Sequence, residues 1–370
     1  GSYDEKKNIG GYGRLNMYYR KNGLELGAYA FGAKQYQPNN QDLQQKTYLD
    51  KTWNQKSENR QVTMVEAMNF RLDASYQLDA NNSIGANFGF LRNPKQTCEA
   101  NMTTAILQDE DQTESSDSHA NSFEQKSTLS SNVYYVGKIG KLGIDFNADW
   151  LWSKNNEDVV TKEQYQEVGM DAQSQTVHSL TDKKYRLLAS KLVFSYPLLG
   201  GELSLGGEYS NTHRTSKYQV VPTNFVSDDN SRITESMASS FLAYSRDFGK
   251  LSMEAGLRYE YIDFNYYEYG KYMPGQSKSY GNWFPSLSLS MPVGKVQMQL
   301  SYATDIDRPS YNYLRSGIQY DNRYTYETGN PFLVSEISKN LNYELAYKWL
   351  TFDMTYSHTS HTMMSNMETY

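Results

Sequence analysis

The sequence is short of the residues and runs that mark several classes of protein. It contains a single cysteine, Cys98, which excludes an intrachain disulfide and a zinc site built from cysteines. No run approaches the roughly 18 consecutive apolar residues of a transmembrane helix. Lysine and arginine form no stripe, and the formal net charge is −6. A surface that tracks phosphates needs clustered positive charge, so nucleic acid is not expected as a partner.

Aromatic residues and glycine are plentiful instead. The chain of 370 residues has 33 tyrosines, 25 glycines and an aromatic share of 14%, against only 9 prolines. Aromatic side chains pack well on pleated surfaces, so this bias favours β structure. The mean hydropathy of −0.75 is typical of soluble domains. Strands that are apolar on one face only are missed by hydropathy, however, so a transmembrane β-barrel stays open as well.

Apolar and polar residues alternate with a period of two along much of the chain. In 251–261 the odd positions hold leucine, methionine, alanine and tyrosine, while charged residues occupy even positions. This period indicates strands with one apolar face. The same pattern occurs in 68–78, 84–91, 142–152, 202–209, 296–302, 341–349 and 350–356, and less cleanly in 129–139, 185–196 and 235–248.

Two kinds of connection separate these segments. Short turns recur roughly every 50 to 60 residues, and most of them contain the glycine or asparagine that supplies positive φ in tight hairpins. They lie at 21–23, 79–82, 140–141, 199–201, 248–250, 292–295 and near 349. Long polar segments, predicted to be loops, lie at 93–124, 156–180, 220–234, 266–279 and 307–338. Seven short turns predict about fourteen antiparallel strands.

Large aromatics on the apolar face keep a constant distance from the short turns. Trp152 lies 11 residues past Lys141, and Trp283 lies 10 residues before Val293. At about 3.3 Å per residue and a tilt of about 45°, ten residues rise roughly 23 Å, close to the ~25 Å apolar band of a membrane barrel. A soluble β-sandwich, the alternative, has no reason to keep that distance. We therefore predict lipid-facing girdles formed by Trp150, Trp152, Tyr259, Tyr261, Trp283 and Trp349, with Trp152, Tyr259, Tyr261 and Trp283 at one common height.

The polar face of the same segments carries charge of both signs. Arg71, Asp73, Glu254 and Arg258 occupy this face of their predicted strands. A lipid-facing Arg or Lys at the bilayer midplane costs about 2–4 kcal/mol. We therefore expect these four side chains to point into a wet lumen.

Three motifs follow one another near the end of the chain. They are Arg308-Pro309-Ser310-Tyr311, Gly329-Asn330-Pro331-Phe332-Leu333 and Tyr343-Glu344-Leu345-Ala346-Tyr347. This order resembles the outer-membrane β-barrel family of the TonB-dependent receptor type, in which Arg-Pro-x-Tyr and Gly-Asn-Pro-x-Leu stretches flank an extracellular loop. The chain departs from the family pattern at Leu314-Arg315-Ser316-Gly317, where Leu-Asn-Pro-Phe is usual.

The resemblance implies an all-β, antiparallel up-and-down transmembrane β-barrel in the outer membrane of a Gram-negative bacterium. It implies a receptor that binds and imports a scarce small ligand, with outer-membrane lipid around it. A plug domain and a TonB-type energising protein are expected as partners of the intact parent, although no plug domain or TonB box is seen in 1–370. The alternative function is an outer-membrane enzyme or adhesin that uses the barrel as an anchor.

The first two motifs have two interpretations, bracing of a loop and contact with a ligand. Arg308 can brace the loop by pairing with Asp305 or Asp307, and Pro309 fixes φ where the strand leaves the membrane. Gly329-Asn330-Pro331 is typical of a turn. The candidate site residues are Arg308, Pro309, Tyr311, Gly329, Asn330 and Pro331.

Metal binding and catalysis have weaker support in the sequence. His358 and His361 are three apart and would face opposite sides of a strand, so they cannot share a metal ion. The acidic residues of the predicted loop 93–124 could offer oxygens to calcium, but their spacing matches no EF-hand loop. No catalytic motif, cofactor site or metal site is recognised, and we expect no enzyme activity.

The direction of the strands predicts an incomplete barrel. The first strand, about 10–20, runs into a short turn, and the last, about 350–364, leaves one. Both chain ends would then lie outside, whereas a complete barrel of this kind has both ends on the periplasmic side. We expect one domain, 1–370, truncated at both ends, forming an open sheet that belongs to a barrel of about twenty-two strands by family resemblance.

Overall fold

The computed structural model describes residues 2–3, 9–48 and 51–365, and within these ranges every regular element is a β-strand. No helix of this part of the chain is long and apolar enough to cross a membrane. The strands are β1 (Ser2–Tyr3), β2 (Ile9–Lys21), β3 (Leu24–Tyr48), β4 (Thr52–Asp79), β5 (Asn82–Gln108), β6 (Asp111–Ile139), β7 (Leu142–Glu167), β8 (Gln173–Leu198), β9 (Gly201–Val221), β10 (Asp229–Phe248), β11 (Leu251–Glu268), β12 (Lys271–Tyr272), β13 (Lys278–Val293), β14 (Val296–Asp307), β15 (Ile318–Asn322), β16 (Thr325–Thr328), β17 (Glu336–Tyr347) and β18 (Leu350–Ser360).

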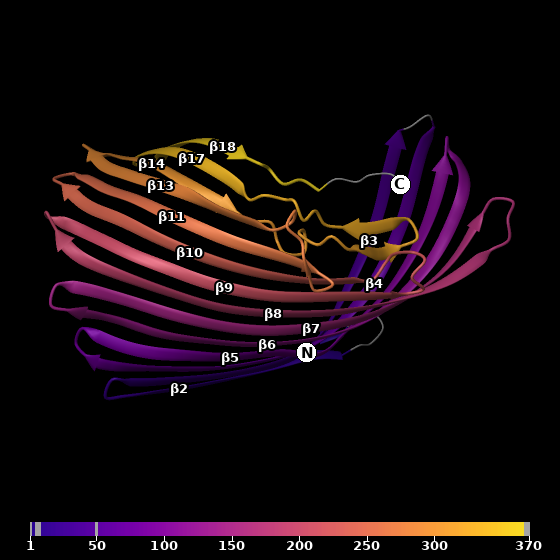
Figure 1. The fold of residues 1–370 in the computed structure, drawn as a ribbon, viewed down its shortest axis with the longest axis horizontal. Coiled ribbons are helices and arrows are strands. Elements are labelled where there is room, and N and C mark those ends of the chain that lie inside the picture. Colours follow the sequence, from indigo (N-terminus) through magenta and orange to yellow (C-terminus); the bar gives the residue numbers. More distant parts are fainter. Residues whose placement is uncertain (1, 4–8, 49–50, 366–370) are drawn as a thin grey trace.

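One antiparallel sheet contains nearly all of these strands. Each strand from β2 to β18 pairs with the next along the chain, leaving out only the short β12, β15 and β16. This path holds fourteen strands, as the sequence predicts, and the two-residue β1 and β12 attach to β2 and β11. Figure 1 shows the colours following the sequence across a strongly curved sheet. Among the described residues β2 and β18 are the end strands of this fourteen-strand path and do not pair with each other, so the predicted open sheet is confirmed.

The seven short turns lie where the sequence places them. Asn22 and Gly23 have φ of 48° and 81°, and Gly140, Gly249 and Gly294 are also in the left-handed region. Glycine and asparagine adopt this conformation with little strain, which is why the sequence reveals these hairpins.

The prediction of a loop over residues 93–124 is wrong. Strand β5 continues to Gln108 and β6 begins at Asp111, so only Asp109 and Glu110 connect them. Segment 156–180 is likewise mostly strand, with β7 ending at Glu167 and β8 starting at Gln173. Where strands extend beyond a membrane, water reaches both faces, and the alternation that reveals a strand in the sequence is lost. At about 3.3 Å per residue, β4 alone spans about 90 Å, several times the apolar band.

The register separates an aromatic face from a charged face. Residues opposite each other in antiparallel strands share a face. Trp283 lies opposite Tyr259, and successive partners lead to Phe146 on β7. Residues two apart also share a face, so this face includes Tyr261, Trp150 and Trp152. Trp283 and Tyr261 are 60% and 45% exposed, as expected of side chains that face outward.

The opposite face carries the charges. Following the paired residues from Arg258 on β11 strand by strand to β4 leads to the face that holds Arg71 and Asp73. These two residues therefore share a face with Glu254 and Arg258. The predicted separation of these residues from the aromatic residues is confirmed. We call this charged face the inner face, because residues 308–335, which connect β14 to β17, pack against it. Figure 1 shows the β15–β16 hairpin of that segment lying across the sheet.

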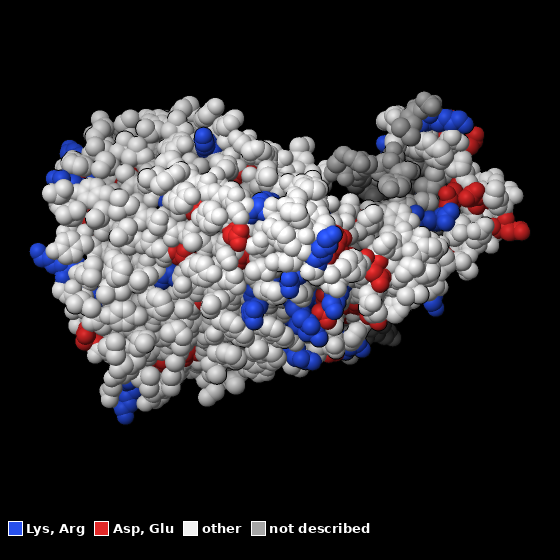
Figure 2. Space-filling view, in the orientation of Figure 1, with Lys and Arg blue, Asp and Glu red and all other residues white. Residues whose placement is uncertain are grey.

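Charged side chains are unevenly distributed along the strands. In Figure 2 they are dense over the right half, where the outer ends of the long strands lie, and sparser over the left half towards the short turns. Trp349 marks the short-turn end, in the turn between β17 and β18, and is 87% exposed. The common height of the four girdle aromatics stays a prediction.

Candidate functional site

Residues 308–335, here called the inner loop, begin at a buried ion pair. The guanidinium of Arg308 contacts the carboxylate of Glu260 on β11, and Arg258 contacts the same carboxylate. The Glu260 side chain is only 1% exposed. The prediction that Arg308 pairs with Asp305 or Asp307 is therefore wrong. Arg308 follows the end of β14, where the chain turns back across the inner face. It therefore contacts a residue of β11 that is distant in the sequence.

The middle of the inner loop is anchored by a small hydrophobic core. Leu314 is 3% exposed and packs with Ile233, Ile262, Phe264 and Tyr266 of β10 and β11. Burying a leucine of this kind contributes about 1.5–3 kcal/mol. Apolar residues on an otherwise polar inner face thus mark where the loop docks.

Tyr311 of the first motif lies beside this core. Its hydroxyl donates a hydrogen bond to Glu235 at 3.1 Å, and its ring packs against Tyr185. Burial, and then the Glu235 carboxylate, raises the pKa of Tyr311. The hydroxyl therefore stays protonated and remains a donor. Tyr311 holds the loop to β10, and it also lines the pocket described below.

The tip of the inner loop reaches a buried glutamate on β7. Glu163 is 1% exposed and accepts hydrogen bonds from the Tyr320 hydroxyl at 2.5 Å and from the Arg323 amide at 3.0 Å. Gln175 of β8 donates to the same carboxylate. Burial, and then Glu163, raises the pKa of Tyr320. Glu163 joins two strands of the sheet to the loop hairpin.

A second glutamate completes the attachment of the tip. The Nε of Arg323 and the hydroxyl of Tyr324 each lie 2.9 Å from one carboxylate oxygen of Glu114 on β6. The Arg323 guanidinium also stacks on Tyr165, 3.5 Å from the ring centroid. The inner loop therefore crosses from β11 to β6 on the inner face.

The Gly-Asn-Pro motif folds back against the first half of the loop. The Asn330 amide donates to the Tyr313 carbonyl at 2.6 Å, and the Asn330 side chain accepts from the Phe332 amide. A Cβ on Gly329 would lie 2.5 Å from the Tyr313 carbonyl oxygen, so this position requires glycine. Pro331 is buried. The second motif is thus a turn that supports the segment around Arg315.

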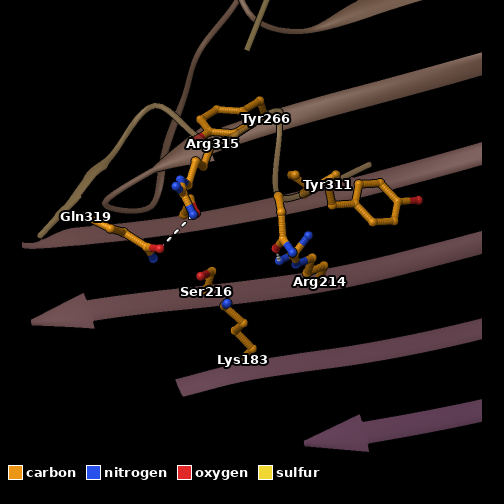
Figure 3. Close-up of a pocket in the computed structure, with 10 residues that line it drawn as sticks. Lys183, Arg214, Ser216, Tyr266, Tyr311, Arg315 and Gln319 are labelled. Carbon is orange, nitrogen blue, oxygen red and sulfur yellow. Dashed lines mark hydrogen bonds between the residues drawn. The ribbon is translucent and has the colours of Figure 1, made fainter. Parts of the chain in front are cut away.

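A pocket opens between the inner loop and the sheet (Figure 3). Counted together with the open solvent at its mouth, the space is about 330 Å³. The sheet contributes Lys183 of β8 and Arg214 of β9, and the loop contributes Tyr311, Asn312 and Arg315. The remaining lining residues are Ser216, Ser231, Ile233, Tyr266 and Gln319. We call this the basic pocket, since its lining holds three cations and no carboxylate.

The positive charges of the basic pocket are only partly balanced by nearby hydrogen-bond acceptors and carboxylates. Arg214 donates to the Asn312 side-chain oxygen at 2.5 Å, and Arg315 donates to Gln319 at 2.7 Å. Arg315 also pairs at 3.2 Å with Glu327, which is largely exposed. Within the described ranges, neither Lys183 nor Arg214 has a carboxylate within 4.0 Å. An oxyanion would supply what this arrangement lacks.

A carboxyl group near the rim of the basic pocket is also buried. Asp229, the first residue of β10, is 8% exposed, and one of its oxygens has no hydrogen-bond partner. Its side chain lies against Gly317 of the inner loop. Burial raises the pKa of Asp229, assisted by Glu268 and opposed by Arg315.

Residues considered for metal or catalysis lie elsewhere. Within the described ranges, no three histidine, cysteine, aspartate or glutamate side chains cluster closely enough to hold a metal ion. His358 lies on β18, and His361 follows it with a φ of 61°. The acidic residues Asp109 and Glu110 form the tight turn between β5 and β6. The sequence does not single out Glu163, Lys183 or Arg214. Glu163 lies in the predicted loop 156–180, whereas Lys183 and Arg214 lie between the predicted segments.

Comparison with known families identifies the class of this barrel. The sequence model of the outer membrane protein beta-barrel family matches residues 136–370. The chain belongs to this family. Its place is therefore the outer membrane of a Gram-negative bacterium, with lipid around the aromatic face. No curated protein matches the sequence.

Solved structures with a similar fold include receptors and a translocator. BauA, the ferric preacinetobactin receptor of Acinetobacter baumannii, is 11% identical, with a TM-score of 0.42 over 98% of this chain. FauA, the alcaligin outer-membrane receptor of Bordetella pertussis, is 10% identical, with a TM-score of 0.38 over 89% of this chain. The chain spans 61% and 51% of these two proteins. The translocator domain of the autotransporter NalP of Neisseria meningitidis is 10% identical, with a TM-score of 0.28, over 77% of this chain and 83% of that domain.

Proposed function

We propose that this outer-membrane barrel is the barrel portion of a TonB-dependent receptor that binds and imports a scarce small ligand, and that it is not an enzyme. The observation that carries the proposal is the inner loop. Its two ends hold the motifs that resemble this receptor type, Arg308-Pro309-Ser310-Tyr311 and Gly329-Asn330-Pro331. Between them the chain is folded onto the inner face rather than out into solvent.

The contacts of the inner loop suit a receptor. Polar attachments at Glu163 and Glu114 can open and re-form, whereas Leu314 provides a fixed apolar anchor. A loop held in this way covers part of the inner face and places its own side chains, including Arg315, next to those of the sheet. Import through such a barrel requires a plug domain and a TonB-type energising protein, both of which we expect as partners of the intact parent.

An uptake experiment tests the proposal. The parent reading frame is deleted from its bacterium, and solutes left in spent medium are compared with those of the wild type. We expect at least one solute to remain in the deletion strain and to be consumed again when the gene is restored. Consumption should also stop when the energising protein is deleted. Unchanged solutes in all strains, or consumption that persists without the energising protein, would contradict import.

A further inference from the structure

We propose that the basic pocket binds an oxyanion, a carboxylate or phosphate group at the end of the imported ligand, and that this anion joins the inner loop to the sheet. The inference deepens the proposed function, on which its link to import rests. The pocket brings together Lys183 and Arg214 from the sheet and Arg315 from the loop. Figure 3 shows their side chains converging from both sides.

The chemistry of the lining selects an anion. Three cations surround the space, while the other polar groups are hydroxyls and amides that donate or accept hydrogen bonds. Guanidinium groups match carboxylate and phosphate geometry, and each charged hydrogen bond contributes about twice as much as a neutral one. The Nε of Arg315 is buried and has no hydrogen-bond partner within the described ranges. It is a donor that the protein itself leaves unused.

Lys183 lies among charges of both signs, of which Arg214 acts on it most strongly. Glu157 and Glu124 attract Lys183 from outside the pocket, but Arg214 and Arg315 both repel it. Like charges held together in a partly buried space destabilise the docked loop until a counter-charge enters. An anion therefore binds the docked loop better than the open one, and by linkage it stabilises docking.

Arg315, which completes the basic pocket, occupies an unusual position in the sequence. Arg315 stands where the chain departs from the pattern of the receptor type it resembles, and its side chain is 15% exposed. The backbone around it is supported by Gly329, whose close approach to the Arg315 carbonyl leaves no room for a side chain. The turn of the second motif thus fixes the residue that completes the pocket.

Binding of inorganic phosphate and of citrate to the refolded protein in detergent micelles tests the inference. Lys183→Met removes one cation, and no hydrogen bond joins Lys183 to the inner loop in the described structure, so the loop should stay docked. Loss of one charged hydrogen bond should weaken binding about 10-fold or more. Lys191→Met, on the same inner face outside the pocket, is the matched control and should bind as the wild type does.

Hydrogen exchange of the inner-loop amides is measured on the same samples. We expect phosphate or citrate to slow exchange in the wild type and in Lys191→Met, and to slow it less in Lys183→Met. Absence of binding at millimolar anion, or equal weakening in both variants, would overturn the oxyanion site. Because this assay needs no import, such a result would leave the receptor proposal to be judged by the uptake experiment alone.

Discussion

Replacement of Glu163 should release the tip of the inner loop. Glu163→Ala removes the acceptor of two loop donors, the Tyr320 hydroxyl and the Arg323 amide. Hydrogen bonds to charged groups contribute about 1.5–3 kcal/mol each, so losing two costs up to about 6 kcal/mol. Removal of a buried carboxylate that has no cation within 4.0 Å in the described structure offsets part of this. We therefore expect docking to weaken by about 3 kcal/mol, roughly a hundredfold.

Hydrogen exchange of the Tyr320 and Arg323 amides measures this opening directly. Glu163→Gln keeps one carbonyl acceptor and should show a smaller increase in exchange. Glu254→Ala, on the inner face near a short turn and away from the loop, is the control and should exchange as the wild type does. If Glu163→Ala exchanged no faster than Glu254→Ala, Glu163 would not hold the loop.

Three further changes have defined outcomes. Gly329→Ala places a Cβ 2.5 Å from a backbone oxygen and should cost about 1–3 kcal/mol of loop docking, seen as faster exchange; unchanged exchange would contradict the close approach. Leu257→Arg should lower the free energy of unfolding, measured with urea on the protein in vesicles, by about 2–4 kcal/mol, while Glu254→Arg changes it little. Equal losses would contradict the assignment of one lipid-facing and one inner face. Burial raises the pKa of Asp229, so its neutral form is favoured when the loop is docked. Docking should therefore strengthen as the pH falls through that raised pKa towards the ordinary value, and Asp229→Asn should remove this dependence; an unchanged pH profile in the variant would refute the assignment.

The sequence predicts hairpins well only where their turns need special residues. Asn22, Gly23 and Gly140 have positive φ, which asparagine and glycine adopt with little strain, and both turns are recognised. Asp109 and Glu110 adopt φ of 50° and 78° without glycine or asparagine, so the β5–β6 turn gives no local signal. The strands on either side of it are polar on both faces, which made the whole segment resemble a loop.

The basic pocket could not be predicted for a different reason. Lys183 and Arg214 meet only because of the register between β8 and β9, and Arg315 arrives from a loop folded back over them. The partner of Arg308 is likewise 48 residues earlier in the chain, on β11. Contacts of this kind depend on tertiary structure and leave no periodic pattern. The unusual residue at Arg315 is the one sequence feature that points to this pocket.

Solvent accessibility at two neighbouring positions tests the central claim, that one face of this sheet meets lipid and the other encloses an aqueous site. Nitroxide labels are attached at Leu257→Cys and Glu254→Cys in a Cys98→Ser background, and the protein is reconstituted into lipid vesicles. We predict that the label at 257 relaxes mainly through oxygen dissolved in lipid, and the label at 254 through a water-soluble nickel chelate. Labels that respond alike, or with the two positions exchanged, would contradict the account.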